Sequence, residues 1–114
     1  MRSTQRKGDI AKSKAISTFT VRGWDVSLPL TESAPYDLVV DIDGKFYRVQ
    51  CKYSSSVCVD LRRIHSNSKG YVVKKYLKED FDWLYVLFSN GVEYLIKDSL
   101  AGRSTVNLKP EFEF

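Results

Sequence analysis

The sequence predicts an α/β fold in which an N-terminal helix packs on a mixed β-sheet. Residues 8–22 have apolar residues at helical spacing, and Gly23 follows as the residue expected just past a helix end. Asp43-Gly44 and Asn90-Gly91 each stand between β-rich runs, which is typical of tight hairpin turns. The expected strands are residues 24–30, 36–42, 45–53, 83–88 and 92–97.

Composition favours one folded domain spanning residues 1–114. Hydrophobic residues make up 43% of the chain and aromatic residues 13%, which excludes a disordered protein. No run approaches the ~20 apolar residues of a membrane span, and no signal peptide is visible. The net charge of +4 is compatible with a polyanionic partner. Cys51 and Cys58 lack metal-site spacing, so we expect reduced thiols and a cytoplasmic, intracellular protein.

The N-terminal region combines a basic arm with an amphipathic helix. Residues 1–7 are polar and basic, and we expect either an ordinary frayed terminus or an arm that contacts phosphate. In the helix that follows, Lys12 interrupts the apolar stripe formed by Ala15, Ile16 and Phe19. At the open end of the helix, this ammonium is expected to point along the core face toward the polar end of the first hairpin.

That first hairpin, residues 35–53, brings polar side chains together. Asp37 lies near the start of its first strand, and Gln50 and Lys52 lie at the end of its second strand. These two ends are neighbours in an antiparallel pair, and side chains two residues apart share a face. Side chains that can bind a metal or transfer a proton therefore converge at one end of the hairpin. A hairpin with a purely structural role does not need such side chains there.

Pro35, Asp37, Gln50 and Lys52 resemble the motif of the PD-(D/E)XK nuclease superfamily. Over residues 6–97 the chain is similar to small homing and phage endonucleases, and archaeal Holliday-junction resolvases share the layout. The resemblance implies a restriction-endonuclease-like core and a Mg²⁺ or Mn²⁺ site formed by Asp37, Gln50 and the backbone carbonyl of Cys51. It also implies that Lys52 polarises the attacking water.

The chain departs from the family pattern at three positions. Tyr36 is inserted between the Pro and the Asp, Gln50 replaces an acid, and Lys12 stands where the family carries a Glu. Lys12 is a natural variation, a surrogate for the charge of the metal, or an engineered inactivating change. Asp9 either substitutes for the missing Glu or is a carboxylate at the helix start. Glu32 either orients a metal-bound water or is solvated.

Residues 54–80 form a basic segment. A serine joint at 54–56 precedes an expected strand at 57–61, a polar loop at 62–70 and a further strand at 71–73. Its cations suit phosphate contacts, although an ordinary solvated loop is the alternative. The expected DNA-binding residues are Arg62, Arg63, Lys69, Lys74 and Lys75.

These features favour a divalent-metal-dependent DNA endonuclease of homing or phage type. One alternative is a DNA-binding protein on the same fold with impaired or no cleavage, because of Lys12; another is a Holliday-junction resolvase. A third is a small structural domain in which Asp37 and Lys52 form an ion pair. The expected partner is duplex DNA or a DNA junction, and a double-strand cut favours a homodimer or a higher oligomer.

Overall fold

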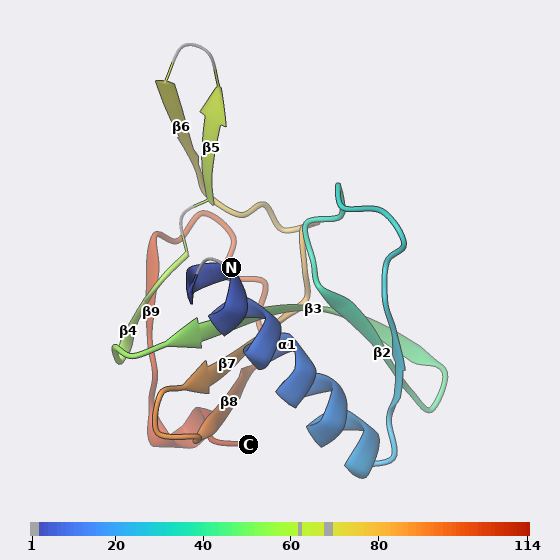
Figure 1. Cartoon of the computed structure of the whole chain (residues 1–114). Coiled ribbons are helices and arrows are strands. Elements are labelled where there is room, and N and C mark those ends of the chain that lie inside the picture. Colours follow the sequence, from blue (N-terminus) through green and yellow to red (C-terminus); the bar gives the residue numbers. More distant parts are fainter. Residues whose placement is uncertain (1–2, 62, 68–69) are drawn as a thin grey trace.

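The computed structural model of the chain describes residues 3–61, 63–67 and 70–114 (Figure 1). Helix α1 (Ser3–Val21) packs on one face of a five-stranded sheet of order β1-β2-β3-β7-β8. The β3–β7 pair is parallel and the other pairs are antiparallel, which confirms the predicted mixed sheet with an N-terminal helix. Its strands are β1 (Asp25–Ser27), β2 (Leu38–Ile42), β3 (Lys45–Ser54), β7 (Trp83–Phe88) and β8 (Glu93–Ile96).

The helix begins earlier than predicted. We expected residues 8–22, with a loose arm before them, whereas Ser3 already lies in α1. Gly8 sits on the exposed side of the helix, where a glycine costs only about 1 kcal/mol, and the residues just before it are good helix formers. Gly23 ends the helix as predicted, with a φ of +86° that suits glycine. The described part of the chain has no helix long and apolar enough to span a membrane.

Two small sheets lie outside the main one. Strand β4 (Cys58–Asp60) pairs with β9 (Thr105–Asn107), and β5 (Arg63–Asn67) pairs with β6 (Gly70–Lys74). The β5–β6 ribbon projects from the body of the molecule (Figure 1). The predicted loop at 62–70 is therefore wrong for 63–67. A ribbon that stands away from the core needs no apolar face, so its strands lack the alternation that sequence analysis looks for. The chain ends with a short helix, η1 (Pro110–Phe112).

The helix meets the sheet through small residues and one large aromatic. Ala11, Ala15 and Phe19 follow one another at intervals of four and are fully buried. The Phe19 ring lies 5.3 Å from Trp24, 5.6 Å from Tyr85 and 5.7 Å from the ring of the final residue, Phe114. The alanines let the helix approach the sheet closely, and Phe19 fixes its C-terminal end.

A half-buried polar contact helps to fix the rotation of the helix about its own axis. The Glu93 carboxylate on β8 accepts hydrogen bonds from the Thr18 hydroxyl (2.6 Å) and the Tyr85 hydroxyl (2.7 Å). Burial and the neighbouring Glu93 raise the pKa of Tyr85, so its phenol remains a donor. Because Thr18 and Phe19 are both held, α1 cannot rotate about its axis to bring other residues against the sheet.

The opposite face of the sheet has its own core. Leu84 and Val86 of β7 pack there against Val59, Leu61, Tyr76 and Phe81. Leu84 pairs with Gln50 and Val86 pairs with Lys52 across the parallel β3–β7 ladder. Because aligned residues on neighbouring strands share a face, Gln50 and Lys52 face away from α1, whereas Cys51 faces the helix.

We predict that Phe19→Ala lowers the free energy of unfolding by about 3–5 kcal/mol, because it removes a fully buried aromatic side chain. Val21→Ala is the matched control two residues later, since Val21 is 85% exposed. It should change stability by less than about 0.5 kcal/mol. Urea denaturation followed by circular dichroism measures both. Equal losses in the two variants would contradict this packing.

Candidate active site

Asp37 is held in place by the backbone of β3. Its N–H donates to the Val49 carbonyl at 2.9 Å, and its Oδ2 accepts a hydrogen bond from the Cys51 N–H at 2.8 Å. Continuing the β2–β3 register by one residue beyond the Leu38–Val49 pair sets Asp37 opposite Gln50. The carboxylate is therefore fixed at the end of the hairpin where Gln50 and Lys52 lie.

Burial and two ammonium groups act on this carboxylate in opposite directions. Desolvation raises the pKa of Asp37 above its ordinary value, and this effect outweighs the Cys51 N–H and the charges of Lys12 and Lys52, which lower it. Lys12 comes from α1 and Lys52 from β3. Both cations are thus close enough to affect the carboxylate, and three elements distant in sequence contribute to one charged cluster.

Lys12 and Asp37 line the same small pocket, of about 250 Å³. Lys12 is half-buried, next to the fully buried Ala11. Glu32 also lines the pocket and is exposed. Its remaining walls come from Ala34, Tyr36 and residues 29–31. Residues 29–30 and Tyr36 were predicted as strand ends, but β1 ends at Ser27 and β2 begins at Leu38, so they belong to the loop between these strands. The path of a loop depends on long-range packing, so no sequence pattern identifies these wall residues.

Gln50 and Cys51 contribute in different ways. Gln50 is half-buried and does not line the pocket of Lys12 and Asp37. The Cys51 thiol is buried and free, and burial, with the Asp37 charge, raises its pKa well above the ordinary value. A protonated thiol under the helix is a poor metal ligand. Only the backbone of Cys51 is thus suited to the site, and its N–H already holds Asp37.

The donor set suits a hard cation that is weakly held. In the ranges 3–61, 63–67 and 70–114, no group of three or more His, Cys, Asp or Glu side chains is placed to hold a metal. Asp37 offers one carboxylate, and the exposed Glu32 lines the same pocket. The Gln50 amide, opposite Asp37 in the backbone register, and the Cys51 carbonyl are neutral oxygens on β3. Mg²⁺ accepts such oxygens, retains waters and commonly uses one or two carboxylates plus a substrate phosphate. The residues present therefore fit such an ion, with Lys12 opposing it.

Other predicted site residues lie elsewhere. Asp9 shares a surface hollow with Arg6, Ile10 and Ser13, away from Asp37. It also lies well inside α1, so the alternative of a carboxylate at the helix start is wrong, because the helix begins at Ser3. Of the expected DNA-binding residues, Arg63 and Lys74 pair across the β5–β6 ribbon and Lys75 is exposed. Arg62 and Lys69 lie outside the described residues.

Comparison with known proteins agrees with this architecture. A family model described as PD-(D/E)XK endonuclease matches residues 2–108. Protein 5.3 of Escherichia phage T7 is 31% identical over 91 residues, which cover 77% of this chain and 75% of the phage protein. The structure of the bacterial homing endonuclease I-Ssp6803I superposes with a TM-score of 0.78 at 31% identity, covering 95% of this chain and 79% of that one. The chain belongs to the PD-(D/E)XK endonuclease family.

Proposed function

We propose that the protein is a divalent-metal-dependent DNA endonuclease of homing or phage type that hydrolyses phosphodiester bonds at Asp37. The observation that carries the proposal is a half-buried carboxylate, fixed by the β3 backbone and flanked by the ammonium groups of Lys12 and Lys52. A purely structural aspartate has no need of this costly desolvation. The similarity to a bacterial homing endonuclease supports the same assignment.

Each residue has a distinct role in this proposal. Asp37, Gln50 and the Cys51 carbonyl would hold Mg²⁺ or Mn²⁺, which when bound supplies charge neutralisation and a more acidic water. The Cys51 N–H orients the Asp37 carboxylate. Lys52 stabilises the negative charge that develops on the attacking oxygen and the phosphoryl group. In the cleavage step, the oxygen of the attacking water bonds to phosphorus, and the P–O bond to the leaving oxygen breaks. The strand is thereby divided into two DNA ends.

Lys12 sets the strength of the site. An ammonium in the Asp37 pocket repels a divalent cation, so metal affinity is low until a DNA phosphate adds negative charge. Cleavage is therefore impaired relative to a site with a second carboxylate. The same observation favours a second candidate function, which is DNA binding without cleavage on this scaffold.

We assign DNA contact outside the site to the β5–β6 ribbon and Lys75. A two-stranded ribbon has the width that the major groove admits. The ribbon projects from the body (Figure 1). Arg63 begins β5 and pairs with Lys74, which ends β6, and Lys75 follows directly. We also propose a homodimer or a higher oligomer, because cutting both strands of a duplex requires two active sites.

Asp37→Asn should lower metal-dependent cleavage of plasmid DNA by at least about 100-fold while leaving DNA affinity near that of the parent. An asparagine oxygen still accepts from the Cys51 N–H, so folding should survive. Lys52→Ala should reduce cleavage similarly but retain more Mn²⁺ binding, because Lys52 is not a ligand. Gel-based cleavage and DNA binding measure these effects. Undiminished cutting by either variant would refute the assignment.

Lys12→Glu should strengthen Mn²⁺ binding by at least about tenfold and raise cleavage, because it replaces a repelling charge with an attracting one. It should also raise the pKa of Asp37, since Lys12 lowers that pKa in the parent. Protons compete with metal at Asp37, so the rise of Mn²⁺ affinity with pH should move to higher pH in the variant. Calorimetry at several pH values measures both effects.

The control for Lys12→Glu is Lys14→Glu, which makes the same charge change at an exposed position of α1. Equal gains in metal affinity from both variants would show a general charge effect and exclude Lys12 from the site. A parent protein that binds DNA without cutting it, together with a cutting Lys12→Glu variant, would establish the second candidate function.

Lys75→Ala and Lys74→Ala should each weaken duplex binding and reduce the slope of log K against log salt by about 0.9, the value for one lost phosphate contact. Lys45→Ala, at the far turn of the β2–β3 hairpin, is the control. Fluorescence anisotropy over a salt series gives the slopes. Unchanged slopes in both the Lys74 and the Lys75 variants would show that this segment is solvated and does not contact DNA.

A further inference from the structure

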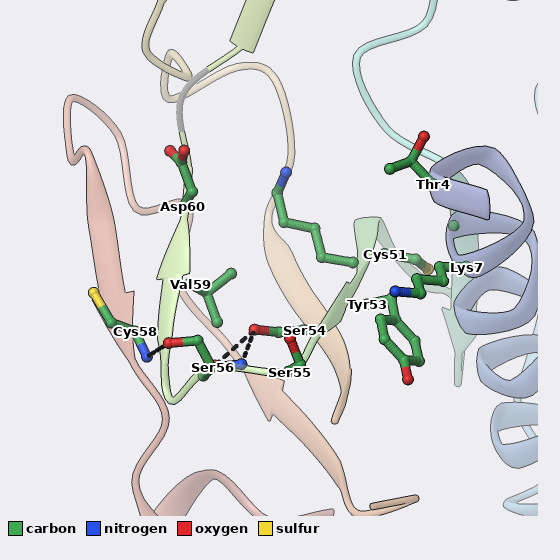
Figure 2. Close-up of a pocket in the computed structure, with 12 residues that line it drawn as sticks. Thr4, Lys7, Cys51, Tyr53, Ser54, Ser55, Ser56, Cys58, Val59 and Asp60 are labelled. Atoms are coloured by element: carbon green, nitrogen blue, oxygen red, sulfur yellow. Dashed lines mark hydrogen bonds between the residues drawn. The ribbon is translucent and has the colours of Figure 1, made fainter. Parts of the chain in front are cut away.

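A second groove has a volume of about 490 Å³, and Figure 2 shows the residues that line it. One wall is the first part of α1, with Thr4 and Lys7. The other is the end of β3, the serine turn at 54–56 and strand β4. Cys51 and Lys52 also line the groove. Because the Cys51 N–H binds Asp37 and the Lys52 charge acts on it, the groove adjoins the proposed site of cleavage.

The cations of the groove come from both walls. The Lys7 ammonium lies 5.5 Å from the centre of the Tyr53 ring, and Figure 2 shows the two side chains facing each other across the gap between α1 and β3. This cation–π contact restrains Lys7 beside the groove without neutralising its charge. Lys52 supplies a second positive charge from β3. The Lys52 ammonium also lies 5.7 Å from the centre of the Tyr76 ring, outside the groove. With Asp60, which lines the groove as well, two cations face one carboxylate, and the remaining positive charge suits an anion beside Lys7.

The serine turn is held by hydrogen bonds and presents a hydroxyl. The Ser54 hydroxyl donates to the Ser56 carbonyl (2.6 Å) and accepts from the Ser56 N–H (3.1 Å), while the Ser56 hydroxyl accepts from the Cys58 N–H (3.2 Å). Ser55, at the centre of the turn, is exposed. Thr4 offers a second exposed hydroxyl from α1. Hydroxyl donors near lysines are typical of DNA phosphate contacts.

We propose that this groove binds a backbone phosphate of the DNA strand next to the phosphate held at Asp37. This inference rests on the proposed function. Asp60 lines the groove, but its carboxylate points away from the serine turn and takes part in another interaction (Figure 2). Lys7 is a positioning residue that sets where the strand lies, and Lys52 links the two phosphate sites.

The test uses a fluorescein-labelled duplex and the full chain carrying Asp37→Asn, so that binding is measured without cutting. Lys7→Gln in this background should weaken binding and lower the salt slope by about 0.9. Ser55→Ala should weaken binding without changing the slope, because a neutral donor releases no counterion. In the cleaving protein, Lys7→Gln should raise KM for DNA several-fold and leave kcat within about twofold, as expected for a contact equal in the ground and transition states.

Lys45→Gln is the matched control, since it removes one exposed lysine at the opposite end of β3. If Lys7→Gln behaves as Lys45→Gln does while the parent binds DNA, the groove proposal is wrong and the proposed function stands. If the parent fails to bind the duplex at any salt concentration, the proposed function fails and the groove proposal fails with it. A loss of kcat without a change in KM would also overturn the positioning role of Lys7.

Discussion

The candidate site depends on the hydrogen bond from the Cys51 N–H to the Asp37 carboxylate. Asp37 is the last residue of the loop 28–37 between β1 and β2, and a side chain in such a loop needs a fixed partner to have a defined position. The second bond, from the Asp37 N–H to Val49, holds the backbone at the same point. Together they fasten the loop to β3, whose parallel pairing with β7 lies at the centre of the sheet. The central strand of the sheet thereby positions a loop residue.

This arrangement has an electrostatic cost that the rest of the cluster offsets. A desolvated carboxylate is unfavourable, and the raised pKa of Asp37 shows that its hydrogen bond and the nearby ammoniums do not fully compensate. An additional cation, whether a metal ion or the charge of Lys12, lowers that cost. The family resemblance assigns the compensation to a metal, whereas this chain supplies part of it with a side chain. In the proposed function, Lys12 stabilises the resting site at the expense of metal affinity.

The parts of the fold that the sequence predicted are those specified locally. The Asp43-Gly44 turn has positive φ at both residues, 53° and 84°, as a two-residue hairpin requires, and so the β2–β3 hairpin followed directly from the sequence. Strand 83–88 was predicted with its observed bounds, because a short apolar run between polar residues marks a buried strand. The start of α1 was missed, since Gly8 was taken as a boundary when it is an exposed interior position.

Only the motif residues of the site could be predicted from the sequence. Spacing along one hairpin indicated Asp37, Gln50 and Lys52, and helical phase indicated Lys12. The pocket wall at residues 29–31 and the groove between Lys7 and Ser55 arise from contacts between elements far apart in sequence. No local pattern encodes such contacts, because they depend on how a loop and a helix end pack against the sheet. The strand at 71–73 was predicted within β6, whereas β5 was taken for part of a loop, because the sequence of Arg63–Asn67 does not alternate between apolar and polar residues.

The central claim is that the Asp37 carboxylate, with Gln50 and Lys52, acts on a DNA phosphate through a weakly held cation. The most direct measurement is a crystal structure of the unmodified protein with duplex DNA and Mn²⁺, in which anomalous scattering locates the metal. We expect an anomalous peak next to the Asp37 carboxylate, and a DNA phosphate near it with Lys52 beside that phosphate. A structure with DNA bound on a different face, or with Mn²⁺ bound away from Asp37, would contradict it.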